Sequence, residues 1–136
     1  MNWPWARRVL TRPELGALGE RHAARALRAK GLRLLEANYR RKQGELDLIA
    51  RDGDTLVFVE VRTRTDCSHV TPLASVNAEK QAQIIRMARY YQRERRLTEC
   101  YCRYDVVEVL ATPTGRITAV HHTPGAFLEG DFSTRY

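Results

Sequence analysis

Three carboxylates in two neighbouring strand-like segments are the side chains best placed for chemistry. Segments 44–50 and 56–62 are apolar at alternate positions, and Asp52-Gly53 between them is typical of a two-residue hairpin loop. Burying an ionised carboxylate costs several kcal/mol unless it is paired or bound to a metal. The carboxylates inside these segments are Glu45, Asp47 and Glu60. Their convergence on one hairpin therefore predicts a cation site.

The register of the hairpin can be predicted from its loop. With Asp52 and Gly53 as the loop, Asp47 lies opposite Phe58 and Glu45 lies opposite Glu60. Diagonal neighbours on one face lie at most about 7–8 Å apart, so two carboxylates can reach one ion. One face then carries Glu45, Asp47, Glu60 and Arg62, and the other carries Leu46, Leu48, Val57, Val59 and Val61. The alternative interpretation is an exposed hairpin face with ordinary surface charges.

Two predicted helices offer further candidates. Glu20 has small helical neighbours, and Gly16 and Gly19 would each cost about 1 kcal/mol relative to Ala unless close packing requires them. Such packing would bring Glu20 to the sheet, although an exposed Glu20 beside arginines fits the spacing equally well. Lys80 precedes an apolar stripe of the second helix, so it either extends into solvent or supplies a charge to the site.

The positive charge is concentrated near the beginning of the chain. The 136 residues have a net charge of +7, and residues 1–42 contain eleven Lys or Arg and three Asp or Glu. A basic region beside acidic strands suits a polyanionic substrate such as nucleic acid. The candidate nucleic-acid contacts are Arg40, Arg41, Lys42 and Arg64. No apolar run is long enough for a membrane span and no signal-peptide pattern is present, so we expect a cytoplasmic protein.

The order of elements predicts one α/β domain. We expect helices at 13–30 and 78–96, and strands at 32–40, 44–51, 54–63, 101–110 and 116–122, with a polar loop at 64–72, which is the order αβββαββ around a mixed sheet. Thr11 and Asn77 are expected to cap the two helices, and Gly31 to end the first. In the fourth strand Tyr104, Val106 and Glu108 alternate with Asp105, Val107 and Val109. A flexible basic arm is expected at 1–12, the domain at 13–128 and a polar tail at 129–136. The Gly-rich stretch from Thr123 is predicted to leave the sheet, with Phe127 and Leu128 as a packing anchor. Asp105, in an apolar strand, is predicted to be a buried partner of an arginine.

These motifs together resemble a known family. The pattern resembles the PD-(D/E)xK nuclease superfamily, including the archaeal Holliday-junction resolvases, and it is most similar to the uncharacterised bacterial YraN-like family. The matching features are Gly19-Glu20, Asn38-Tyr39-Arg40, the run 44–49, Phe58-Val59-Glu60-Val61-Arg62, Lys80 and the run 103–107. The resemblance covers about residues 14–128. It implies a restriction-endonuclease-like fold and a metal-dependent endonuclease that acts on structured or branched DNA.

The resemblance also implies a role for each residue. Asp47, Glu60 and the carbonyl of Val61 would hold Mg²⁺ or Mn²⁺, with Glu20 joining through water. Arg62 stands where the superfamily has Lys; because Arg stays protonated, it can only stabilise negative charge. Lys80 would then be a candidate for the missing amine.

Other functions remain open on the sequence alone. The first alternative is a nucleic-acid-binding module that does not cleave. A second is a zinc site formed by Cys100, Cys102, His121 and His122, although the usual two-residue spacer between the cysteines is missing. Symmetric cutting of two junction strands would favour a homodimer, but no sequence feature marks an interface.

Overall fold

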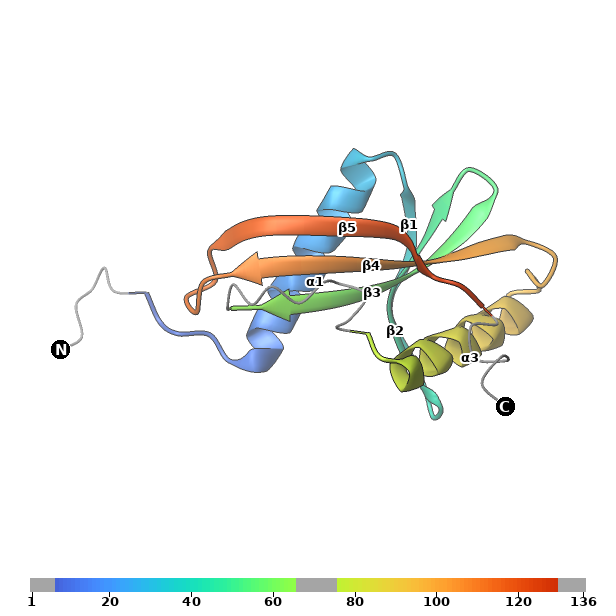
Figure 1. Cartoon of the computed structure of the whole chain (residues 1–136), viewed down its shortest axis with the longest axis horizontal. Helices are drawn as coiled ribbons and strands as arrows, with labels where there is room; N and C mark the ends of the chain where they lie inside the picture. The colour runs from blue at the N-terminus through green and yellow to red at the C-terminus, as the bar shows by residue number, and fades with distance from the viewer. Residues whose placement is uncertain (1–6, 66–75, 130–136) are drawn as a thin grey trace.

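The described part of the chain forms a five-stranded sheet with a helix packed on each face (Figure 1). The computed structural model describes residues 7–65 and 76–129. The elements are α1 (Arg12–Ala29), β1 (Arg33–Arg41), β2 (Gly44–Asp52), β3 (Thr55–Arg64), α3 (Ala78–Glu94), β4 (Tyr101–Ala111) and β5 (Ile117–Phe127). The predicted mixed α/β order is therefore confirmed. Most of the predicted loop 64–72 lies outside the described residues.

The strands follow the order β1-β2-β3-β4-β5 across the sheet. Neighbours pair antiparallel except β3 and β4, which are parallel. Because a parallel pair needs a long crossover connection, α3 lies between β3 and β4 in the chain. The crossover places α3 against the sheet face opposite α1.

Both helices begin at the predicted caps. The Thr11 hydroxyl accepts a hydrogen bond from the backbone N–H of Glu14 at 3.3 Å, and the Asn77 side chain accepts one from Lys80 N–H at 2.8 Å. After α1, Gly31 adopts a φ of 92°, which favours glycine and ends the helix as predicted. Within the described part of the chain, neither helix has the length and apolar character needed to cross a bilayer.

Two core layers lie on opposite faces of the sheet. Ala23 and Leu27 of α1 pack against one set of strand residues, which includes Leu48, Val57, Val59, Val107 and Val109. Ile84, Met87 and Tyr91 of α3 pack against the other set, which includes Tyr39, Phe58, Tyr104 and Val106. The predicted alternation along the fourth strand, with Tyr104 and Val106 against Val107 and Val109, is confirmed.

The last strand is longer than predicted. The sequence from Thr123 contains Pro124 and Gly125 and was expected to leave the sheet, but β5 continues through a register shift to Phe127. Phe127 pairs with Tyr104, and their rings stack with centroids 5.2 Å apart. Phe127 is therefore the predicted anchor, whereas Leu128 remains largely exposed. The burial of the Phe127 ring outweighs the weak strand propensity of the residues before it.

The register of the β2–β3 hairpin differs from the prediction by two residues. Asp52 pairs with Thr55, so the loop is Gly53 and Asp54, and Gly53 takes the positive φ of 59°. Consequently Ile49, not Asp47, lies opposite Phe58. A shift of two residues leaves each side chain on its predicted face near the loop, because the side-chain period of a strand is two.

The far end of β2 departs from the predicted pattern. Leu46 packs in the core layer beneath α3, whereas Leu48 packs in the layer beneath α1, although a regular strand would place both on one face. Asn38 on the neighbouring β1 has a φ of 53°, which bends the chain between the pairs Tyr39–Leu46 and Ala37–Leu48. The β1–β2 hairpin therefore curls toward α3 (Figure 1).

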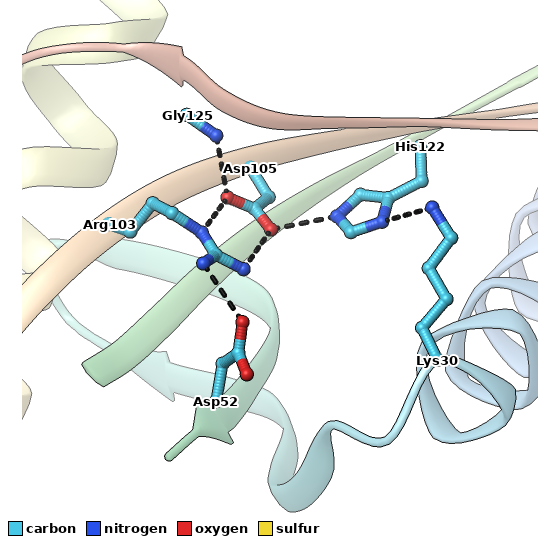
Figure 2. A network of polar contacts seen from close by, with 6 residues as sticks. All are labelled: Lys30, Asp52, Arg103, Asp105, His122 and Gly125. Carbon is cyan, nitrogen blue, oxygen red and sulfur yellow. Dashed lines mark hydrogen bonds and ion pairs between the residues drawn. The ribbon is translucent and has the colours of Figure 1, made fainter. Parts of the chain in front are cut away.

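A buried polar cluster, the Asp105 network, ties the elements together (Figure 2). It consists of Lys30, Asp52, Arg103, Asp105, His122 and Gly125. Asp105 is fully buried and accepts hydrogen bonds from Arg103 Nε at 2.9 Å, Arg103 Nη2 at 3.1 Å, His122 Nε2 at 2.7 Å and Gly125 N–H at 2.9 Å. His122 Nδ1 lies 2.9 Å from Lys30 Nζ, and Arg103 Nη1 bonds Asp52 at 3.0 Å. The prediction of a buried Asp–Arg pair at Asp105 is confirmed.

Candidate active site

The candidate site forms where β2 and β3 separate. The last pair between these strands at this end is Leu48–Val59, after which β2 turns away (Figure 1). Asp47 and Glu60 are the next residues on the two strands, at the point of separation. The Oδ2 atom of Asp47 accepts a hydrogen bond from Val61 N–H at 2.8 Å. This side-chain hydrogen bond replaces the backbone hydrogen bond that a continued strand pair would provide. The prediction that Glu45 pairs with Glu60 is wrong, because the strands have already parted.

Glu60 is nearly buried, with 7% of its surface exposed, and two cations approach it. Its Oε1 atom lies 3.5 Å from Arg62 Nε and 3.9 Å from Lys80 Nζ. Lys80 comes from the first turn of α3, where Asn77 caps the helix. The structure therefore brings both predicted cationic residues to this carboxylate.

Glu20 reaches the same place from α1. A Cβ atom on Gly19 would lie 1.9 Å from Thr63 Oγ1, so only glycine permits this approach of α1 to β3. The prediction of close packing is confirmed at Gly19, whereas a Cβ on Gly16 would meet nothing within 4 Å. Glu20 hydrogen-bonds the Asn38 side chain and lies close enough to Asp47 for their charges to interact. We call Glu20, Asp47 and Glu60 the carboxylate site.

The electrostatics of the carboxylate site oppose ionisation. Burial, followed by the neighbouring charge of Asp47, raises the pKa of Glu60 to about 7. Burial also raises the pKa of Asp47, against the opposing effect of its bond from Val61 N–H. Burial and the charge of Asp47 raise the pKa of Glu20. Arg62 and Lys80 thus compensate these carboxylates only in part.

The donor set of the carboxylate site fits a hard divalent cation. Within residues 7–65 and 76–129, no three His, Cys, Asp or Glu side chains are close enough to form a metal cluster by themselves. Mg²⁺, however, commonly uses one or two carboxylates and completes its shell with water and substrate phosphate. Asp47 and Glu60 are buried carboxylates at the point where the strands part, and Val61, whose N–H bonds Asp47, follows Glu60 in the chain. A cation there would favour the ionised form of both carboxylates, which burial opposes.

The four predicted nucleic-acid contacts have different surroundings. Arg40 pairs with Glu45 at 3.1 Å, and Arg41 pairs with Glu94 at 2.6 Å while lying over the Tyr39 ring. Lys42 is exposed in the turn between β1 and β2. Arg64 lies 3.8 Å from Glu108 and lines a groove of 490 Å³ beside α1. Arg64 is thus the one of the four that lies along a groove leading to the carboxylate site.

The structure does not bring the candidate zinc ligands together. Cys100 and Cys102 pack against the core layer beneath α3. His122 is instead hydrogen-bonded to the fully buried Asp105 in the Asp105 network. The zinc interpretation is therefore wrong: adjacent strands place the cysteines and this histidine in different environments.

Sequence reasoning missed two contributions to the site. Asn38 hydrogen-bonds the Glu20 side chain, and its φ is positive. Asn adopts this conformation more readily than most residues, but the residue type alone did not predict the bend. Arg21, Arg25 and Arg28 lie exposed along α1, and their i, i+4, i+7 spacing already placed them on one helical face.

Comparison with known proteins identifies the family. The uncharacterised protein family UPF0102 matches residues 19–109, which include every residue of the carboxylate site. A UPF0102 protein of Chromohalobacter salexigens is 52% identical over 69% of this chain and 76% of its own length. UPF0102 proteins of Moorella thermoacetica and Syntrophotalea carbinolica are 42% and 46% identical, over 88% and 85% of this chain and 99% and 93% of their own lengths. The chain therefore belongs to the UPF0102 family.

Proposed function

We propose that this protein is a metal-dependent nuclease that hydrolyses phosphodiesters in structured or branched DNA. The observation that carries the proposal is the convergence of Glu20, Asp47 and Glu60 with Arg62 and Lys80 where β2 and β3 part. The arrangement agrees with the restriction-endonuclease-like fold and with the PD-(D/E)xK pattern in the sequence. Buried carboxylates with raised pKa values are characteristic of functional sites.

Each residue has a role in the proposed reaction. Asp47, Glu60 and the Val61 carbonyl would hold Mg²⁺ or Mn²⁺, which when bound would supply Lewis-acid stabilisation of the phosphoryl oxygens and activation of water. Arg62 stabilises the negative charge that develops on the phosphate, because a guanidinium does not give up its proton. Its buried Nε–H makes no hydrogen bond within the described residues, although Glu60 Oε1 lies 3.5 Å away, and the exposed part of the side chain is available to a phosphate oxygen. Lys80 supplies the amine that the superfamily carries at the position of Arg62.

A cleavage assay tests this proposal. Labelled four-way junction, flap, single-stranded and duplex DNA would be incubated with Mg²⁺ or Mn²⁺ and the native protein, Asp47→Asn, Lys80→Met or Asp54→Asn. Asp54 is an exposed carboxylate in the loop of the same hairpin and serves as the matched control. We expect metal-dependent cleavage by native protein and Asp54→Asn, and none by Asp47→Asn. Near-normal cleavage by Lys80→Met would remove Lys80 from the mechanism.

The second candidate function is a nucleic-acid-binding module without cleavage. It is favoured by the two cations near Glu60, which partly neutralise that carboxylate without a metal. In the same assay this alternative predicts binding of DNA by the native protein and no product with either metal.

A further inference from the structure

Two grooves meet at Glu20. The first, of 490 Å³, lies between the first half of α1 and the end of β3, and is lined by Arg12, Gly16, Glu20, Val61, Arg62 and Arg64 among others. The second, of 530 Å³, follows the second half of α1 beside β1 and β2, and its lining includes Glu20, Arg21, Arg25, Arg28 and Asn38. Since Glu20 lines both grooves, this member of the carboxylate site lies where they meet.

Both grooves carry arginines that the described residues do not neutralise. Arg12, Arg21, Arg25 and Arg28 are exposed, and no ion pair within the described part of the chain engages them. On the opposite side of the molecule Arg41, Arg89 and Arg95 are each paired with a glutamate. Exposed arginines without an ion pair to another described residue also occur on and after α3, at Arg86, Arg93 and Arg96. The arginines of α1 differ from these because they line two grooves that share Glu20 of the carboxylate site.

The lining of the second groove is partly apolar. Ala17, Ala24, Ala37 and Leu48 lie among its arginines. A surface that contacts only duplex phosphates needs no apolar lining. Grooves for single strands combine cationic residues with side chains against which bases pack; these are commonly aromatic, and in this groove they are aliphatic. Arg12 and Arg28 are sixteen residues apart, which corresponds to about 24 Å along the helix, enough for several nucleotides. Figure 1 shows α1 crossing β3, β4 and β5, so the path runs across the strands.

We propose that one single strand of nucleic acid lies along α1 through both grooves. Arg21, Arg25 and Arg28 contact its phosphates on one side of the carboxylate site, and Arg12 and Arg62 contact them on the other. The inference rests on the proposed function only in placing the scissile phosphodiester beside Glu20. It adds the occupant of the grooves and the direction of its path.

The test measures binding without cleavage. Fluorescence anisotropy in EDTA would use an oligothymidylate of about 20 nucleotides, longer than the site of a single-strand groove, together with the matching RNA and a duplex. The variant is Arg21→Gln/Arg25→Gln/Arg28→Gln. The matched control is Arg86→Gln/Arg93→Gln/Arg96→Gln, which removes the same charge from exposed positions on and after α3. Thermal melting checks that both variants fold, and Gln keeps the helix propensity of Arg.

We expect the α1 variant to bind the single strand at least tenfold more weakly than native protein. The affinity of the control variant should fall less than threefold. Loss of three phosphate contacts should also reduce the slope of log affinity against log salt by about 2. Absence of binding by native protein, equal losses in the two variants, or preference for the duplex would overturn the inference. Binding that depends on α1, without any cleavage when metal is added, would refute the proposed nuclease and leave the strand path standing. Cleavage unaffected by the α1 variant would refute the path alone.

Discussion

The Asp105 network and the carboxylate site both place buried acids against the same sheet, but they treat those acids in opposite ways. Asp105 is fully buried and accepts four hydrogen bonds, two of them from one arginine. Asp47 and Glu60 lie where the sheet opens; burial raises the pKa of both, and neighbouring carboxylates, Glu45 beside Asp47 and Asp47 beside Glu60, raise it further. The charge of the first cluster is compensated within the protein, whereas Arg62 and Lys80 compensate the carboxylates of the second only in part.

This difference distinguishes buried charges that support the fold from buried charges that serve a function. A buried carboxylate that only supports the fold is best surrounded by donors, because an unpaired charge costs several kcal/mol. A carboxylate that must bind a cation and release it with product benefits from incomplete compensation. We therefore expect removal of the acid to have opposite effects on stability in the two regions.

The largest expected effect is at the Asp105 network. Asp105→Asn removes the buried counter-charge of the partly exposed Arg103 and changes the partner of the buried His122, and it should lower the free energy of unfolding by about 3–5 kcal/mol. Urea denaturation followed by circular dichroism measures this change. Asp52→Asn removes the half-exposed partner of the same arginine and should cost less than about 1 kcal/mol. Equal costs for the two variants would show that Asp105 is not specially compensated.

The next effect concerns the approach of α1 to the carboxylate site. Gly19→Ala places a methyl group against Thr63 and should cost about 1–3 kcal/mol through overpacking, while displacing Glu20. Gly16→Ala, three residues away on the same helix, meets open space and should stabilise by up to about 1 kcal/mol through helix propensity. Thermal unfolding of both variants provides the comparison. A neutral Gly19→Ala would contradict the close helix–sheet contact.

The smallest expected effect is a gain at Glu60. Because the folded pKa of Glu60, about 7, exceeds the ordinary glutamate pKa of about 4.5, the unfolded chain loses the proton first as pH rises. Stability therefore falls between about pH 4.5 and 7, and the full penalty is present above pH 7. Glu60→Gln in EDTA should raise the unfolding free energy by about 1–3 kcal/mol at pH 8 and have little effect at pH 4.

Glu99→Gln is the control for the Glu60 variant, because it changes an exposed glutamate. It should leave the pH dependence of the unfolding free energy as in native protein. If Glu60→Gln were destabilising at pH 8, Arg62 and Lys80 would be sufficient partners and the site would resemble the Asp105 network.

The sequence predicted the fold more completely than it predicted the geometry of the site. Alternating apolar residues, the capping residues Thr11 and Asn77 and the glycine after α1 all report local preferences, and the elements follow them. The extension of β5 depended on the packing of Phe127 against Tyr104, a contact between residues distant in sequence.

The composition of the site was predictable, but its geometry was not. Gly19 and Glu20 signalled a close helix–sheet approach, and the structure contains it. The separation of β2 from β3 beyond Leu48 was not predictable from periodicity, since it depends on the bend at Asn38 and on the Asp47 bond to Val61. Those are tertiary features that no local pattern encodes.

Calorimetric titration of the metal-free protein with Mn²⁺ tests most directly whether the carboxylate site is built for a cation. Native protein and Asp54→Asn should bind with the same saturable heat, with affinity that falls as the pH is lowered below about 7, where Glu60 takes up a proton. Asp47→Asn should show no saturable binding. Absence of binding by native protein, or undiminished binding by Asp47→Asn, would contradict the account.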